Sequence, residues 1–251
     1  MNKISKNIIK ENIDEPVRLN KFLSDAGFCS RREADRLIEA GKVIVDEKVA
    51  IMGQKVSKDN KVKVNDQIIT ANNEMILIAF NKPIGIECTT DLNNPNNIID
   101  FIKYPTRIYP VGRLDKNSSG LILLTNTGEI VNKILKSSNY HEKEYIVDVD
   151  KHITNDFINK MSQGVEIFLD DGKKKVTTRP CKIKQIDKCT FSIILTQGYN
   201  RQIRRMCQAL GFNVTKLKRI RIMNINLGNL PIGHYRNITE SELKKLLSGL
   251  N

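Results

Sequence analysis

Tryptophan is absent from the chain, and only 6% of its 251 residues are aromatic. Proteins that bind single-stranded nucleic acid by stacking many successive bases need a series of aromatic side chains, so this is not expected to be the main binding mode. No apolar run approaches the roughly 20 residues of a membrane-spanning helix, and no membrane partner is expected. Residues 1–16 lack the apolar segment of a signal peptide and are predicted to be a disordered leader.

Cysteine and histidine are also scarce. The chain has five cysteines and three histidines, and it contains no Cys-x-x-Cys pair. An odd number of cysteines without paired spacing argues against a disulfide framework and against a zinc site. We therefore expect a reduced protein of the cytoplasm that holds no metal.

Acidic residues are missing from a long stretch near the C-terminus. Between Lys188 and Thr239 there is no aspartate or glutamate, whereas nine lysines and arginines occur. The formal net charge of the whole chain is +13, and a basic surplus of this size favours a polyanionic partner. We expect this part of the chain to face phosphate groups.

One acidic residue stands in a position that is typical of a reactive group. Asp115 lies on a loop bounded by Gly112 and Gly120, and the apolar run Leu-Ile-Leu-Leu that follows predicts a buried strand. Loops held against rigid elements often carry catalytic groups. Arg113 and Lys116 flank the carboxylate and favour its charged form, in which an aspartate can act as nucleophile or base. Taken alone, the pattern also fits a solvated turn aspartate.

Residues 17–70 have the pattern of a small separate unit. A first helix is predicted from apolar residues at helical spacing after Val17, and a second from the capping box that begins at Ser30. Short strands are expected over residues 43–45 and 61–64. Two helices followed by short strands make a compact module of mixed type.

A larger unit is expected over residues 75–251, after a short linker at 71–74. Its strands and helices alternate too irregularly for a doubly wound parallel sheet, which favours an α+β fold. The basic tract 173–179 is open to two interpretations, a mobile loop near RNA or a solvated hairpin tip. The strands are predicted at 75–80, 121–124, 143–149, 165–168, 181–186 and 191–196, and the helices after Asn126, over 153–161 and after Asn200.

Two of these elements carry polar residues on a regular face. Tyr145 lies on the apolar side of the strand over 143–149, and from position alone it is more typical of a core residue than of a catalytic one. Like charges on one helix face repel, which favours an anion opposite them, either RNA phosphate or Asp115 itself. The helix predicted after Asn200 carries a polar stripe of this kind on one face, made by Arg201, Arg204, Arg205 and Gln208.

The chain resembles the ribosomal RNA pseudouridine synthases that carry an N-terminal S4 domain, over residues 17–248. Ser118 stands where many members have threonine, and both residues offer a hydroxyl. The segments 219–224 and 233–239 are most similar to the large-subunit synthase F branch. The resemblance rests on four ordered motifs, Asn81-Lys-Pro-Ile-Gly-Ile86, Val111-Gly-Arg-Leu-Asp115 with its following Ser-Ser-Gly, Lys143-Glu-Tyr145 and Asn200-Arg-Gln-Ile-Arg-Arg-Met206.

The resemblance implies a fold and a division into domains. It implies an S4-like RNA-binding domain over 17–70 and a catalytic domain over 75–251, the latter an α+β domain with a mixed, mainly antiparallel sheet flanked by helices and loops. The implied phosphate contacts of the first domain are Lys21, Arg31 and Arg32. Arg31 and Arg32 lie near the predicted start of the second helix, where cations oppose the helix dipole. Contacts with RNA phosphates would account for their presence there.

The resemblance also assigns roles at a catalytic site. Asp115 is the implied essential aspartate, which either attacks ribose C1′ or removes the C2′ proton. Tyr145 would lie against the target base, and Arg204 would pair with Asp115. Arg113 is a candidate to fill the space that the base leaves in the RNA, and Arg201 and Arg205 are candidate phosphate contacts.

The expected activity is isomerisation of a uridine to pseudouridine in structured RNA, by a monomer that needs no cofactor. The implied substrate is 23S ribosomal RNA, with a transfer RNA as a second target that the resemblance allows. A non-catalytic RNA-binding or ribosome-assembly factor would also explain the charge and the S4 pattern. It would not explain why the four motifs occur together, so the sequence favours the enzyme.

Overall fold

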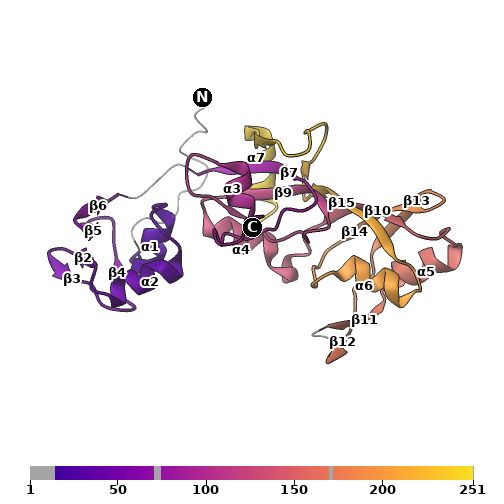
Figure 1. The fold of residues 1–251 in the computed structure, drawn as a ribbon, viewed down its shortest axis with the longest axis horizontal. Helices are drawn as coiled ribbons and strands as arrows, with labels where there is room; N and C mark the ends of the chain where they lie inside the picture. The colour runs from indigo at the N-terminus through magenta and orange to yellow at the C-terminus, as the bar shows by residue number, and fades with distance from the viewer. Residues whose placement is uncertain (1–14, 71–74, 170–171, 251) are drawn as a thin grey trace. The chain divides into compact units, whose positions relative to one another are not determined.

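The computed structural model describes residues 15–70, 75–169 and 172–250 (Figure 1). The chain divides into two compact units. The described part of the first unit extends to Ile76 and includes Tyr104–Ile108 and Asn126–Gly128, and the remaining residues form the second. The predicted leader up to residue 14 and the predicted linker at 71–74 lie outside the described residues.

The first unit is a two-helix module with a small sheet. Ser30 begins α2 as predicted, because its hydroxyl accepts a hydrogen bond from the Glu33 N–H at 3.1 Å. One core contains Leu19, Leu23 and the inward valines of the sheet, all of them buried. Its elements are α1 (Leu19–Asp25), α2 (Arg31–Glu39), the pair β1 (Val17–Arg18) and β4 (Lys55–Val56), and the sheet β3-β2-β5-β6, with β2 (Val43–Val45), β3 (Lys48–Val49), β5 (Val62–Val64) and β6 (Gln67–Ile69).

The second unit is built on one mixed sheet, in the order β13-β14-β10-β15-β9-β7-β17, with β16 beside β15 and β8 beside β9 (Figure 1). Only the β15–β9 pair is parallel among the described strands, so the expected mixed, mainly antiparallel α+β sheet is confirmed. The strands are β7 (Leu77–Lys82), β8 (Tyr109–Pro110), β9 (Ser119–Thr125), β10 (Lys143–Val149), β13 (Lys182–Asp187), β14 (Thr190–Leu195), β15 (Val214–Ile222), β16 (Ile225–Asn226) and β17 (Tyr235–Asn237).

Helices and a two-stranded sheet make up the other described elements after β7. α5 packs against β13, and α6 packs against β15 and β11. The helices are α3 (Ile98–Ile102), α4 (Gly128–Leu135), the short 3-10 helix η1 (Ser137–Asn139), α5 (Asn155–Gln163), α6 (Gln202–Ala209) and α7 (Glu240–Ser248), and the hairpin consists of β11 (Glu166–Leu169) and β12 (Lys174–Thr177).

The apolar run after the Asp115 loop is a central strand, as its composition predicted. Leu121, Ile122, Leu123 and Leu124 are fully buried in β9, which pairs with β7 along its whole length. A strand buried on both faces is stabilised by the burial of apolar side chains on each side of the sheet. The loop that carries Asp115 is therefore anchored to one of the most buried strands of the protein.

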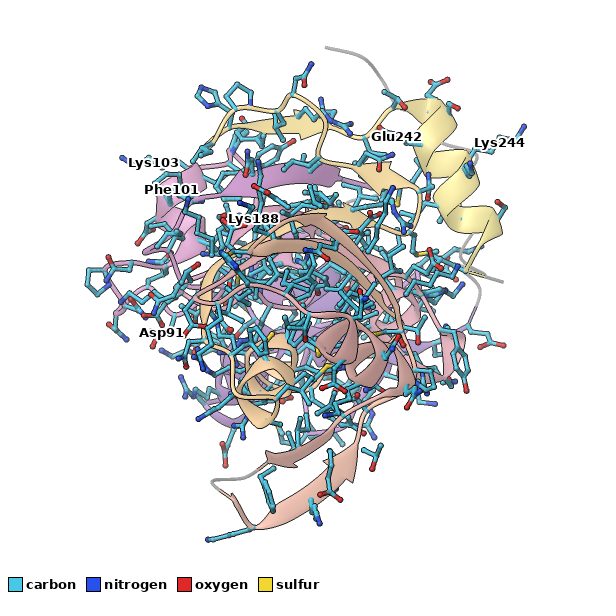
Figure 2. All side chains as sticks on the ribbon, turned by 90° about the vertical axis from the view of Figure 1, so that its right-hand side faces the viewer. Asp91, Phe101, Lys103, Lys188, Glu242 and Lys244 are labelled. Carbon is cyan, nitrogen blue, oxygen red and sulfur yellow. The ribbon has the colours of Figure 1, made fainter. Side chains whose placement is uncertain are left out.

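The structure favours the hairpin interpretation of residues 173–179, and it differs from the sequence prediction at the starts of two helices. The basic tract 173–179 contains β12, which pairs with β11, and this hairpin projects from the second unit (Figure 2). α4 begins at Gly128, so Asn126 does not cap it, and the Asn126 Oδ1 instead accepts a hydrogen bond from the Ile76 N–H at 2.9 Å. α6 begins at Gln202 rather than after Asn200. An asparagine whose side-chain oxygen already accepts a hydrogen bond from another backbone N–H is not needed as a helix cap.

The start of α6 has an unusual backbone. Arg201 precedes the helix with φ +53°, in the left-handed region that few residues other than glycine and asparagine adopt. The Gln202 side chain reaches back and accepts a hydrogen bond from the Tyr199 N–H at 3.0 Å. This turn is fixed by a side chain of the helix itself.

We predict that Gly120→Ala destabilises the protein strongly. Gly120 has φ +100°, and a Cβ at this position would overlap the carbonyl oxygen of Arg219 on the paired strand β15. The expected loss in the free energy of unfolding is at least about 2 kcal/mol, measured by urea denaturation. Gly211→Ala is the control, since Gly211 has φ +80° with open space around it and should lose only about 1 kcal/mol. Equal losses in the two variants would contradict the argument.

Candidate active site

The loop between β8 and β9 is held from the side by the segment that follows β7. The Leu114 N–H donates a hydrogen bond to the Cys88 Sγ at 3.3 Å, and the Gly85 N–H donates to the Lys116 carbonyl oxygen at 2.9 Å. These two bonds bracket Asp115 on either side. The Asp115 side chain keeps 26% of its surface exposed, so it is fixed in place and still open to a ligand.

Two guanidinium groups approach the same oxygen of Asp115. The Arg201 Nη1 lies 3.7 Å from Oδ2, and the Arg204 Nε lies 3.8 Å from it. Both distances are too long for hydrogen bonds, and the buried Arg204 Nε has no hydrogen-bond partner among the described residues. The carboxylate is thus held by charge, while its lone pairs stay available for chemistry.

Arg204 also ties three elements together. Its Nη2 donates to the Asn117 carbonyl oxygen at 2.8 Å, and its Nη1 donates to the Val214 carbonyl oxygen at 3.1 Å. Burial and the neighbouring Arg201 lower the pKa of Arg204, and the Asp115 carboxylate acts in the opposite direction. One side chain of α6 therefore fixes the Asp115 loop relative to the start of β15.

Tyr145 comes to the site from the middle of the sheet. It lies on β10 between Ile193 of β14 and Arg219 of β15, and 9% of its surface is exposed. The Arg219 guanidinium carbon is 5.9 Å from the centre of the tyrosine ring. Its Nε donates to the Leu121 carbonyl oxygen at 2.7 Å, so this buried cation connects the tyrosine strand with β9.

A pocket of about 80 Å³ opens between these elements. Asp115 and Tyr145 both line it, and Leu195 and Leu217 add apolar walls. A flat ring can lie against a tyrosine and aliphatic side chains, while a carboxylate and cations act on the group attached to it. Such an arrangement fits a nucleoside whose base is enclosed and whose sugar faces the acid.

The structure brings together most of the predicted site residues. Asp115, Tyr145, Arg113 and Arg201 line the pocket, and Arg204 contacts Asp115 from behind. Their roles stay predictions. The arrangement in one pocket arises because β8, β10 and α6 converge on one part of the sheet, which the order of the motifs along the chain does not reveal.

The other predicted RNA contacts lie elsewhere. Arg205 donates a hydrogen bond to the Phe168 carbonyl oxygen of the hairpin, so its guanidinium supports β11 in this structure. In the first unit, Lys21 pairs with Asp25 at 2.7 Å, and Arg31 and Arg32 are exposed on α2.

Sequence reasoning missed two buried cations. Lys82 is fully buried, and its Nζ donates to the carbonyl oxygens of Pro83 at 2.8 Å and Ile86 at 2.6 Å. Burial lowers the pKa of Lys82, although the Cys88 thiol and the Asp115 carboxylate act in the opposite direction. Arg219 is 3% exposed. The available signals were a lysine two residues after the apolar run of β7 and an arginine two residues after an inward leucine.

Residues 15–70, 75–169 and 172–250 contain no cluster of three or more histidines, cysteines, aspartates or glutamates that could hold a metal ion. Over the same ranges, no helix combines the length and the apolar character that crossing a membrane requires.

Comparison with known proteins agrees with this geometry. Residues 76–209 match the family described as RNA pseudouridylate synthase, and residues 17–59 match the S4 domain. The chain is 50% identical over 232 residues to the dual-specificity RNA pseudouridine synthase RluF of Escherichia coli K12, an alignment that covers 92% of this chain and 78% of the relative.

Two further similarities cover nearly the whole chain. The ribosomal large subunit pseudouridine synthase B of Bacillus subtilis is 38% identical over 91% of this chain and 95% of its own length. A crystal structure of a pseudouridylate synthase superposes with a TM-score of 0.66 at 29% identity, covering 92% of this chain and 99% of that one. The chain therefore belongs to the RNA pseudouridylate synthase family and is a pseudouridine synthase with an S4 domain at its N-terminal end.

Proposed function

We propose that this enzyme isomerises a specific uridine to pseudouridine with Asp115 as its essential carboxylate and without a cofactor. The observation that carries the proposal is the placement of Asp115 and Tyr145 in one pocket, with Arg204 bracing the acid. The three groups come from a loop, a strand and a helix, so their convergence reflects the tertiary fold rather than local sequence.

The reaction requires no redox partner. The bond from ribose C1′ to uracil N1 breaks, the base turns, C1′ bonds to C5, and the proton on C5 leaves as N1 gains one. Asp115 takes part in one of two ways, by attacking C1′ or by removing the C2′ proton. Lone pairs that are free of hydrogen bonds suit either role.

Tyr145 and Arg204 have separate tasks in this proposal. The Tyr145 ring lies against the uracil and keeps the detached base within the pocket, where apolar walls exclude water. Arg204 acts through Asp115, because it sets the position of the carboxylate and stabilises its charge. The target uridine must leave its stacked position to enter such a pocket. We propose that Arg113, an exposed residue of the pocket lining, fills the vacancy in the RNA.

We propose that the substrate is 23S ribosomal RNA and that a tRNA is a second substrate. RluF is named for dual specificity, and the Bacillus relative for the large ribosomal subunit. A net charge of +13 supports a large polyanion. We place the enzyme in the cytoplasm as a monomer, with domains at 17–70 and 75–251.

RNA binding is proposed to divide between the two domains. The S4 residues Lys21, Arg31 and Arg32 would add affinity through phosphates, while Arg113 and Arg201 would act at the pocket. Arg205 is a weaker candidate, since its guanidinium already bonds the Phe168 carbonyl oxygen.

Asp115→Ala is expected to abolish isomerisation and leave RNA binding within about twofold, because one carboxylate among many cations contributes little to affinity. The assay is tritium release from 23S ribosomal RNA transcribed with [5-³H]uridine, alongside filter binding of the same RNA. Asp66→Ala, on an exposed turn of the first unit, is the matched control and should release tritium at the wild-type rate. Wild-type release by Asp115→Ala would end the proposal.

Arg204→Lys is expected to lower kcat by about 10²-fold, because a lysine cannot bond the Asn117 and Val214 carbonyl oxygens while facing Asp115. Arg205→Lys is the neighbouring control, since Arg205 bonds the hairpin instead, and its kcat should change less than about threefold. Single-turnover rates with saturating RNA separate the two variants. A kcat for Arg204→Lys close to that of Arg205→Lys would refute the positioning role.

The double variant Arg31→Ala with Arg32→Ala is expected to weaken RNA binding and to leave kcat unchanged at saturating RNA. If each arginine neutralises one phosphate, the slope of log Kd against log salt should fall by about 1.5. Lys63→Ala serves as the control, because Lys63 already pairs with Glu47 at 3.0 Å. An unchanged slope would place these arginines outside the RNA interface.

A further inference from the structure

Gln197 is a buried polar residue whose side-chain nitrogen has no hydrogen-bond partner in the part of the chain that the structure describes. It lies two residues after the end of β14, and 8% of its surface is exposed. Its Nε2 is buried and makes no hydrogen bond with any described residue. A buried donor without an acceptor is costly, and native proteins seldom keep one without a reason.

The position of Gln197 is one where the strand pattern predicts an apolar side chain. Phe191, Ile193 and Leu195 form the inward row of β14, and Gln197 continues that row by two residues. Leu195 and Gln197 both line the pocket that contains Asp115 and Tyr145. The row thus ends in a carboxamide at the place where the proposed base would lie.

The segment that carries Gln197 is fixed on both sides. The Arg179 Nη1 donates to the carbonyl oxygen of Thr196 at 3.2 Å, and the Tyr199 N–H donates to the Gln202 Oε1 at 3.0 Å. Gln202 itself is 4% exposed. The backbone on either side of Gln197 is therefore held in place, which fixes the point from which its side chain reaches the pocket wall.

Uracil offers the hydrogen-bonding partners that the Gln197 side chain lacks. One edge of the ring carries two carbonyl oxygens, which accept hydrogen bonds, and between them N3–H, which donates one. A carboxamide offers an N–H donor beside a carbonyl acceptor and can pair with a carbonyl and N3–H together. Turning the amide over exchanges its oxygen and nitrogen, yet in either orientation one polar atom lacks a partner until such an edge arrives.

We propose that Gln197 is a specificity-determining residue that recognises the uracil edge of the target nucleoside. The inference rests on the proposed function of the same pocket, and it identifies the side chain that forms hydrogen bonds with the base. It assigns Gln197 a direct contact with the substrate, in contrast to Arg204, which acts through Asp115.

Gln197→Met tests the proposal, because methionine keeps the length of the side chain and removes both hydrogen-bonding groups. The expected loss in kcat/KM for tritium release from [5-³H]uridine-labelled 23S ribosomal RNA is about 10- to 100-fold. Gln185→Met, on the exposed face of β13, is the matched control and should stay within about twofold. Activity of Gln197→Met within twofold of wild type would overturn the inference.

A second readout separates base recognition from a merely structural role. Binding of uridine 5′-monophosphate and of its 2-thio, 4-thio and 3-methyl derivatives is measured by NMR titration of the full-length protein. Wild type should bind at least one derivative about fivefold or more weakly than the parent nucleotide, and Gln197→Met should bind that derivative and the parent equally. A variant that loses activity but still discriminates like wild type would contradict the proposal.

The two hypotheses fail in different ways. If wild type releases no tritium but discriminates among the nucleotides through Gln197, the proposed reaction fails and the base contact stands. If wild type is active and its nucleotide discrimination does not depend on Gln197, the reaction stands and the base contact fails. Should Gln197→Met not fold, Gln197→Glu replaces it, since glutamate keeps the acceptor and loses the donor.

Discussion

The site depends on the ionic contact between Asp115 and two arginines that flank the start of α6. A carboxylate placed 3.7 Å and 3.8 Å from two guanidinium groups is attracted by both without being hydrogen-bonded by either. The loop that carries Asp115 continues into β9, which is buried from Gly120 to Thr125, and Arg204 bonds that loop and β15 at the same time. The position of the Asp115 carboxylate therefore depends both on the packing of the sheet and on its ionic contacts with the two arginines.

Buried cations are the unusual feature of this region. Lys82 and Arg219 are both buried, where their charges would be costly without compensation. Each is satisfied in part by backbone carbonyl oxygens, those of Pro83 and Ile86 for Lys82 and that of Leu121 for Arg219. The Arg219 guanidinium carbon lies 5.9 Å from the centre of the Tyr145 ring, and the Asp115 carboxylate opposes the effect of burial on the pKa of Lys82, so both cations interact with groups that line the pocket.

The sequence predicts the elements well and their contacts poorly. Apolar runs located β7 and β9, alternation located β10 with Tyr145 inward, and the ordered motifs pointed to Asp115, Tyr145 and Arg204. Asn126 and Asn200 were wrong as helix caps. The Asn126 Oδ1 accepts a hydrogen bond from the Ile76 N–H instead, and the side chain of Gln202, the first residue of α6, bonds the Tyr199 N–H at the start of that helix. Gln197 escaped notice because a single polar residue after a strand looks like the start of a turn, and only tertiary burial shows that its amide is unpartnered.

The most direct test of the central claim is a structure of the Asp115→Asn enzyme bound to a substrate RNA fragment. The amide keeps the shape of the carboxylate and removes its charge, so bound RNA should accumulate without reaction. The account predicts one uridine turned out of the RNA, with its ribose C1′ and C2′ beside residue 115 and its base between Tyr145 and Gln197. RNA bound firmly with this pocket empty would contradict it.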